Sequence, residues 1–138
     1  MTAEDDGTIA NDDMAYRRVH PKQAPPDLDG VPRLSSAAFK LTEADHGRLS
    51  IYLRSEVESI PATSSDCVAQ GAPHTIAELD VSYIRNLAHG VLRDPITSGA
   101  VPNICDPAHA VITGFATSRK DTDRQARALR EKARWPTS

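Results

Sequence analysis

The stretch Leu49-Ser50-Ile51-Tyr52-Leu53 has the clearest strand pattern in the chain. Its three apolar residues alternate with Ser50 and Tyr52, so an extended backbone places them on one face. The opposite face carries Ser50, Tyr52 and, one step further, Arg54. This pattern predicts a strand with one face in the core and one face turned away from it.

Weaker patterns on both sides of this strand predict the other elements. Strands are expected at 16–20, 91–93 and 109–115, the last two as a hairpin, and helices just after Leu53, over 75–89 and over 121–134. Residues 35–39 form a short element anchored by Phe39. The helix over 75–89 rests on a capping box, Thr75 and Glu78, and on Gly90 as its end. This order predicts an α+β fold: a small, mostly antiparallel sheet with helices on one face and a C-terminal helix.

The length of 138 residues fits one domain. Residues 1–14 are rich in Asp and Glu and poor in large apolar side chains, which predicts a disordered acidic tail before a single domain at 15–135. The segments 21–35 and 61–73 are polar loops interrupted by proline, and their role, as lids or as spacers, stays open.

Composition excludes several functional classes. A net charge of −3 argues against wholesale wrapping of nucleic acid, and 4% aromatic residues are too few for a base-stacking platform. No apolar run is long enough for a transmembrane helix. Cys67 and Cys105 are expected to be reduced thiols of a cytoplasmic protein. Pro107 separates Cys105 from His109, so we expect no metal site, and nothing indicates a cofactor.

The candidate site residues come from three predicted strands. Arg18 and His20 share a face of the first strand, where the positive charge of Arg18 favours a neutral, proton-accepting imidazole. Ser50, Tyr52 and Arg54 offer hydroxyl and guanidinium donors to a phosphate group. His109 begins a later strand and is a candidate acid–base group. The alternative for each is a solvated strand face or a histidine bonded to backbone.

The predicted C-terminal helix carries basic residues beside its apolar stripe. They are Arg124, Arg127, Arg130 and Arg134. Such a stripe is able to bind nucleic-acid phosphates or an acidic protein partner, and it also fits an ordinary exposed helix. The oligomeric state stays open.

Five short runs carry a resemblance. They are YRRVHP, SSAAF, LSIYL, GVLRDP and DPAHAVITG, and they resemble a small family of uncharacterised bacterial proteins over residues 16–135. The chain is also similar to RES-type ADP-ribosyltransferase-like domains, which degrade NAD. Those domains place an arginine in a YRVH-type strand, a tyrosine in a later strand, and an acid shortly after it. The similarity implies that Arg18, Tyr52 and Glu56 or Glu58 hold these places.

Two functional hypotheses follow. The first, which we favour at this point, is a small binding or accessory protein that acts with a protein or nucleic-acid partner, because no specific catalytic motif is present. The alternative is a small NAD- or nucleotide-processing enzyme in which Arg18 holds phosphate, Tyr52 positions the ligand, and His20, Glu56 or His109 transfers a proton. The enzyme requires Arg18, Tyr52 and His109 to meet in one cleft, whereas the binding protein predicts scattered residues and an exposed apolar patch.

Overall fold

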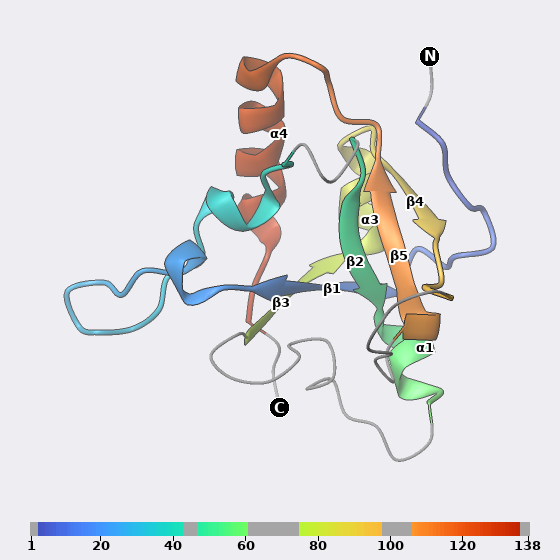
Figure 1. Cartoon of the computed structure of the whole chain (residues 1–138), viewed down its shortest axis with the longest axis horizontal. Helices are drawn as coiled ribbons and strands as arrows, with labels where there is room; N and C mark the ends of the chain where they lie inside the picture. The colour runs from blue at the N-terminus through green and yellow to red at the C-terminus, as the bar shows by residue number, and fades with distance from the viewer. Residues whose placement is uncertain (1–2, 43–46, 61–74, 98–105, 136–138) are drawn as a thin grey trace.

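The computed structural model describes residues 3–42, 47–60, 75–97 and 106–135. Five strands form one antiparallel sheet in the order β3-β1-β2-β5-β4 (Figure 1). They are β1 (Met14–Val19), β2 (Leu49–Leu53), β3 (Thr75–Asp80), β4 (Gly90–Arg93) and β5 (His109–Thr113). The helices are α1 (Arg54–Glu58), α3 (Val81–Asn86) and α4 (Arg119–Lys132), with 3-10 turns η1 (Pro21–Gln23), η2 (Ser36–Phe39) and η4 (Asp106–Ala108). The predicted α+β class and the β4–β5 hairpin are confirmed.

The apolar face of β2 lies at the centre of the main core, as the alternation predicts. Leu49, Ile51 and Leu53 are fully buried. Phe39 of η2 and Leu129 of α4 belong to the same cluster. Burying each of these large side chains contributes about 1.5–3 kcal/mol relative to leaving it exposed. The period-two pattern therefore decides which face of the sheet α4 and η2 cover.

Helix α4 closes this core at the C-terminal end of the chain. The Ser118 side chain caps it by accepting a hydrogen bond of 3.2 Å from the backbone N–H of Asp121, so the helix begins slightly before its predicted start. Ala126 and Leu129 form its buried stripe. Trp135 packs against the core just beyond the helix, as expected from its position.

A smaller apolar cluster lies on the opposite face of the sheet. Tyr16 of β1, Tyr52 of β2 and Ile76 of β3 meet there with Val57 of the short helix α1. Burial raises the pKa of the Tyr16 hydroxyl above its usual value. This second cluster positions one wall of the site described below.

The predicted helix over residues 75–89 is wrong in its first half. Thr75–Asp80 form β3, which pairs with β1 along the full length of both strands. The expected capping box does not form, because α3 begins only at Val81 and has no side-chain cap. Ile76, Ala77 and Leu79 are all buried, two on one face of the strand and one on the other. Pairing with the edge of β1 and burial on both faces override the local helical signal.

The sequence predicted that Gly90 ends a helix, but in the structure Gly90 begins β4. The positive φ of 67° belongs instead to Ala88. A Cβ atom added at Gly90 would lie 1.8 Å from the backbone oxygen of Glu4. Glycine is required here because another segment of backbone passes directly over the strand.

That segment is the acidic N-terminus, and residues 3–13 differ from the disordered tail that composition predicted. Ile9 is only 1% exposed and belongs to the main core. Arg85 donates hydrogen bonds of 2.9 Å to the backbone oxygens of Asp6 and Ile9, and its Nε lies 3.1 Å from the Asp5 carboxylate. A single apolar anchor and charge complementarity with a distant arginine offset the cost of ordering this segment.

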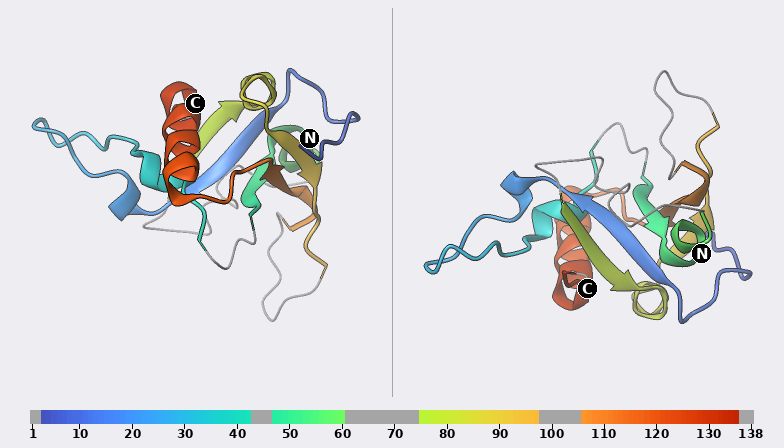
Figure 2. Two further views of the ribbon diagram at one scale, coloured as in Figure 1. Left: turned by 90° about the horizontal axis from the view of Figure 1, so that it is seen from above. Right: turned by 90° about the horizontal axis from the view of Figure 1, so that it is seen from below.

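Strands β1 and β2 separate after a short pairing. Ala15 pairs with Leu53 and Tyr16 pairs with Tyr52. Beyond these two pairs, β1 runs across the direction of β2 (Figure 1). Arg17 bridges the widening gap, since its Nη1 donates a 2.7 Å hydrogen bond to the backbone oxygen of Ser50. In the views from above and below, the N-terminal segment lies at one end of the molecule, and the loop between η1 and η2 projects beyond α4 at the other (Figure 2). The divergence leaves room for a pocket between the two strands.

Candidate functional site

A pocket of about 310 Å³ opens where β1 and β2 diverge. Its described lining residues are Arg17, Arg18, His20, Gln23, Ser50, Tyr52, Ile96 and His109. We call it the histidine pocket. It brings together Arg18, His20, Ser50, Tyr52 and His109, all of which the sequence singled out. Side chains from the ends of β1, β2 and β5 converge because the register places Tyr52 beside both Tyr16 and His109.

His109 is held rigidly in this pocket. Its Nδ1 lies 2.7 Å from the backbone oxygen of Asp94 and 3.4 Å from the Asp94 carboxylate. The imidazole meets the ring of Tyr52 edge-on, with 5.3 Å between centroids, and the residue is 8% exposed. Because a carbonyl oxygen only accepts, Nδ1 carries the proton, and in the neutral ring Nε2 is the proton acceptor.

His20 has the opposite hydrogen-bonding arrangement. His20 is the N-cap of the 3-10 turn η1, and its Nδ1 accepts a hydrogen bond of 3.1 Å from the backbone N–H of Lys22. The Gln23 side chain accepts a 2.9 Å hydrogen bond from the backbone N–H of His20 and completes a capping box. The proton of the neutral His20 ring therefore lies on Nε2. In the neutral rings, Nε2 of His109 is therefore a hydrogen-bond acceptor, whereas Nε2 of His20 is a donor.

Two arginines give the histidine pocket a positive charge. Arg17 is partly buried, and its Nε donates a 2.9 Å hydrogen bond to the backbone oxygen of Ala38 in addition to its bond with Ser50. Arg18 follows on the other face of β1 and is exposed. Among the described lining residues there is no aspartate or glutamate. The described lining residues therefore carry a net positive charge, which favours an anionic ligand.

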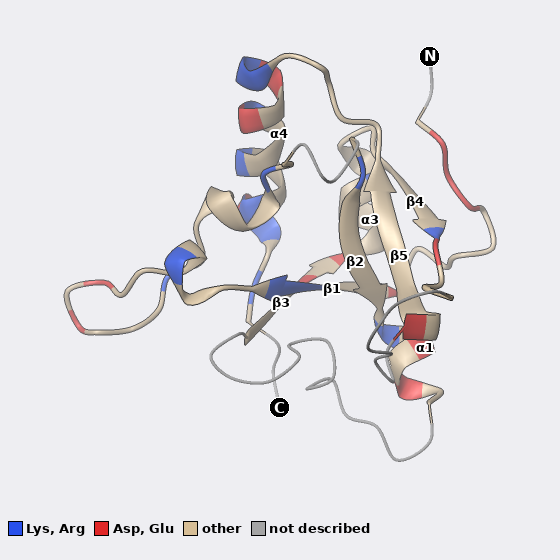
Figure 3. Cartoon of the chain, viewed as in Figure 1, with Lys and Arg blue, Asp and Glu red and all other residues tan. Residues whose placement is uncertain are grey.

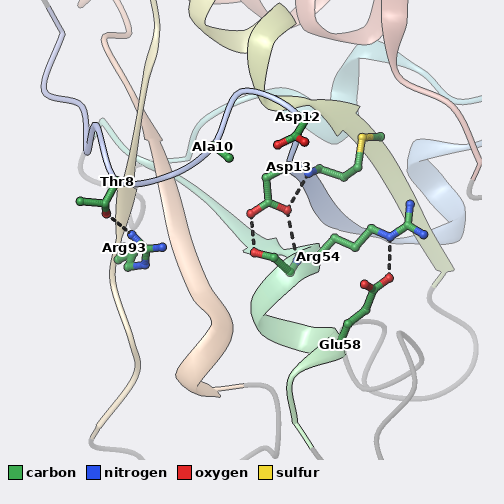
Figure 4. Close-up of a pocket in the computed structure, with 9 residues that line it drawn as sticks. Thr8, Ala10, Asp12, Asp13, Arg54, Glu58 and Arg93 are labelled. Carbon is green, nitrogen blue, oxygen red and sulfur yellow. Dashed lines mark hydrogen bonds and ion pairs between the residues drawn. The ribbon is translucent and has the colours of Figure 1, made fainter.

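Glu56 and Arg54 lie outside this pocket, contrary to their predicted roles. Arg54 is not on the polar face of β2 but starts α1, where its Nε lies 2.6 Å from a Glu58 carboxylate oxygen (Figure 4). Glu56 pairs with Arg93 at 3.5 Å. The chain turns into a helix directly after Leu53, so alternation along the strand ends there. Neither acid of α1 therefore lines the histidine pocket.

A second pocket of about 380 Å³ lies beside α1 (Figure 4). Its polar groups bond to one another: the Asp13 carboxylate accepts hydrogen bonds from the backbone N–H and the hydroxyl of Ser55, while Arg54 pairs with Glu58. These contacts tie the N-terminal segment to α1, which explains the cluster as a structural one.

Basic and acidic residues both lie along α4 (Figure 3), and the four arginines predicted to bind a partner make different contacts. Arg130 donates a 2.9 Å hydrogen bond to the backbone oxygen of Leu34, and Arg134, beyond α4, pairs with Glu78 at 3.1 Å. Arg124 pairs with Asp121 within the helix, and Arg127 is exposed. Two of the four predicted partner-binding residues thus fasten the helix to the body of the protein, and the basic stripe is interrupted.

Two residues of the pocket, Gln23 and Ile96, and one residue behind His109, Asp94, were not recognised from the sequence. Asp94 was assigned to a turn because it precedes a proline, and only the pairing of β4 with β5 brings it to His109. Gln23 ends the 3-10 turn η1 and Ile96 lies in a loop, and neither position belongs to a periodic pattern. The spacing of a capping box after His20 was the one signal for Gln23.

Three expectations from the sequence concern the cysteines, a metal site and a membrane-spanning helix. Cys67 and Cys105 lie outside the described residues. Within the described ranges, no group of three or more His, Cys, Asp or Glu side chains is placed to hold a metal ion. The described helices include none that is long and apolar enough to cross a membrane.

Comparisons of the chain with protein-family models, with curated proteins and with solved structures find no match.

Proposed function

We propose that this protein is a small enzyme that binds a phosphate-bearing nucleotide in the histidine pocket and acts on it by acid–base chemistry. The observation that carries the proposal is the convergence of Arg18, Tyr52 and His109 on one pocket. That convergence is the arrangement that the enzyme hypothesis required, and a scattered arrangement was the expectation for a binding protein.

Charge and hydrogen bonding support a phosphate as the recognised group. Arg18 is exposed at the pocket and has the planar donor geometry that matches phosphate oxygens. The Nε2–H of His20 and the Ser50 hydroxyl add neutral donors beside it. A phosphate bound here would meet positive charge on the β1 side and the acid–base group of His109 on the β5 side.

The remaining lining suits the sugar or base of a nucleotide. Tyr52 and Ile96 provide apolar surface next to the polar groups. A volume of about 310 Å³ is at the lower end of typical ligand pockets. The pocket therefore holds one nucleotide unit, and a larger ligand such as NAD would extend outside it.

His109 is the residue that we assign to proton transfer. Its Nε2 is an acceptor, and the Asp94 carboxylate faces the positive charge that the ring gains on taking a proton. Because Glu56 and Glu58 lie outside the pocket, the acid implied by the similarity to ADP-ribosyltransferase-like domains has no place in this proposal.

Thermal unfolding in the presence of AMP, ADP-ribose and NAD tests the binding step. A ligand at about one hundred times its Kd stabilises the fold by about 2.7 kcal/mol, which raises Tm by several degrees. We expect the shift to disappear in Arg18→Ala and to persist in Arg127→Ala, an exposed arginine outside the pocket. The absence of a shift with all three ligands would refute the proposal.

A second candidate function is binding to a protein partner, and one observation favours it. Leu28 is 106% exposed and Val31 is 54% exposed, both on a loop that projects from the body of the protein (Figure 1). The Asp27 carboxylate stabilises this loop by accepting hydrogen bonds from the backbone N–H groups of Asp29 and Val31. Binding of a protein partner that is lost in the Leu28→Asp variant and retained in the Arg18→Ala variant would support this function.

A further inference from the structure

We infer that the histidine pocket hydrolyses a phosphoanhydride bond of a nucleotide, with His109 as the general base and the Nε2–H of His20 as a hydrogen-bond donor. The inference rests on the proposed nucleotide-binding function and specifies the bond that is broken. It follows from the different hydrogen bonds of the two imidazole rings.

The Nδ1 atoms of the two histidines make opposite hydrogen bonds. In His109, Nδ1 donates to the backbone oxygen of Asp94 at 2.7 Å, which leaves Nε2 with a lone pair. In His20, Nδ1 accepts from the backbone N–H of Lys22 at 3.1 Å, and a proton on that nitrogen would break the bond. In the neutral rings, these hydrogen bonds leave the lone pair on Nε2 of His109 and place the hydrogen on Nε2 of His20.

The hydrogen on Nε2 of His20 limits the chemistry that this ring is able to perform. A neutral imidazole that gives up its Nε2 proton becomes an imidazolate, which is far too basic to form in water near pH 7. His20 in this arrangement stabilises negative charge but does not protonate a leaving group. The leaving group must then depart without taking a proton. A phosphate does so, and the donors of the pocket stabilise its charge, whereas an alkoxide released from a phosphodiester needs a proton. Nicotinamide also departs from NAD without a proton, but its loss forms a cationic sugar, which the positive charge of the described lining residues disfavours.

The reaction balances with water as the co-reactant. His109 Nε2 takes a proton from a water molecule, the water oxygen forms a bond to one phosphorus, and the bond from that phosphorus to the bridging oxygen breaks. The bridging oxygen leaves with the electron pair as part of a phosphate. Arg18 and His20 Nε2–H stabilise this charge, and His109 later releases its proton to solvent.

The test uses one substitution at both histidines. ADP-ribose is incubated with the wild type, His109→Gln and His20→Gln, with and without magnesium, and AMP and ribose 5-phosphate are measured. Glutamine keeps an N–H donor near the position of Nε2 but accepts no proton. We expect His109→Gln to lower turnover by about 100-fold or more and His20→Gln by about tenfold or less. The pH profile of His20→Gln should follow that of the wild type.

Three controls accompany this test: a variant of Tyr52, measurements of folding and AMP binding, and two competing substrates. Tyr52→Phe, which removes the neighbouring phenol as a source of protons, is expected to lose about tenfold or less. Thermal unfolding and AMP binding show that each variant is folded and retains the pocket. NAD, for nicotinamide release, and 2′,3′-cyclic AMP, a phosphodiester, are compared as substrates, and both should be turned over more slowly than ADP-ribose.

Each alternative result has a definite meaning. Equal losses in His20→Gln and His109→Gln, or a loss in Tyr52→Phe as large as that in His109→Gln, would overturn the assignment of roles. Preference for nicotinamide release or for the phosphodiester would overturn the phosphoanhydride and leave the nucleotide enzyme standing. AMP binding without turnover of any substrate would refute the hydrolysis alone, whereas no nucleotide binding would refute the proposed function as well.

Discussion

The Nδ1 atom of His109 lies 2.7 Å from the backbone oxygen of Asp94, although the two residues are 15 positions apart in sequence. The pairing of β4 with β5 makes this contact, since the backbone N–H of Asp94 in turn donates a 3.0 Å hydrogen bond to the oxygen of His109. The orientation of the imidazole thus depends on the backbone of the hairpin, and the exposed Asp94 carboxylate is a secondary contact.

Replacing Asp94 by alanine should therefore have little effect on stability. The hydrogen bond to the backbone oxygen stays, and an ion pair whose carboxylate is 58% exposed contributes about 0–1 kcal/mol. Urea unfolding at pH 7 measures the difference in free energy. A loss above about 2 kcal/mol would mean that the side chain, and not the backbone, holds the ring.

Replacing Arg134 by alanine should destabilise the protein by about 1–3 kcal/mol. Glu78 is 5% exposed, and its carboxylate accepts a 3.1 Å hydrogen bond from Arg134 Nε, so the substitution leaves a buried charge without this partner. Urea unfolding of Arg124→Ala is the matched control, because Arg124 pairs with an exposed Asp121, and it should change stability by less than about 1 kcal/mol. Adding Glu78→Gln to Arg134→Ala should restore part of the loss.

The free energy of unfolding should decrease at mildly acidic pH because of His89. This residue is 4% exposed, and burial lowers its pKa below the usual 6.5, against the smaller opposing effect of its hydrogen bond to the Thr113 backbone oxygen. Below pH of about 6.5 the unfolded chain takes up a proton that the folded chain does not, so stability falls as pH decreases toward the folded-state pKa, by at most about 1.4 kcal/mol per pH unit.

The variant His89→Asn isolates this contribution. Urea unfolding between pH 8 and pH 5 should show a shallower decrease in the variant than in the wild type, because all other histidines are common to both proteins. Parallel curves for the two proteins would show that His89 does not carry the effect.

Replacing Gly90 by alanine should release the N-terminal segment or destabilise the fold by about 1–3 kcal/mol. The added Cβ would lie 1.8 Å from the backbone oxygen of Glu4. A backbone atom cannot rotate away from the clash as the end of a flexible side chain can. Limited proteolysis of residues 3–13 and thermal unfolding measure the effect. Gly7→Ala is the control, since no atom lies within 4 Å of the added carbon. Equal behaviour of the two variants would contradict the close packing of this segment.

The candidate site was partly predictable because its polar residues sit at strand positions. Alternation placed Ser50 and Tyr52 on the face away from the main core, and the chemistry of Arg18, His20 and His109 marked them as candidates. Arg54 and Glu56 were misassigned because the chain leaves the strand at Leu53 and enters α1. Asp94 was missed because its contact with His109 exists only across a strand pair.

By itself, the sequence determined those parts of the structure in which local spacing and burial agree. The alternating apolar residues of β2 and the stripe of Ala126 and Leu129 in α4 follow from periodicity, and Phe39 as an anchor follows from its large apolar side chain. Tertiary structure decided that Thr75–Asp80 form a strand, that the acidic N-terminus packs on the sheet, and that β1 and β2 diverge around the histidine pocket. The physical reason is that edge pairing, charge complementarity and strand divergence join residues far apart in the chain, and these contacts outweigh local preferences only when the rest of the fold is present.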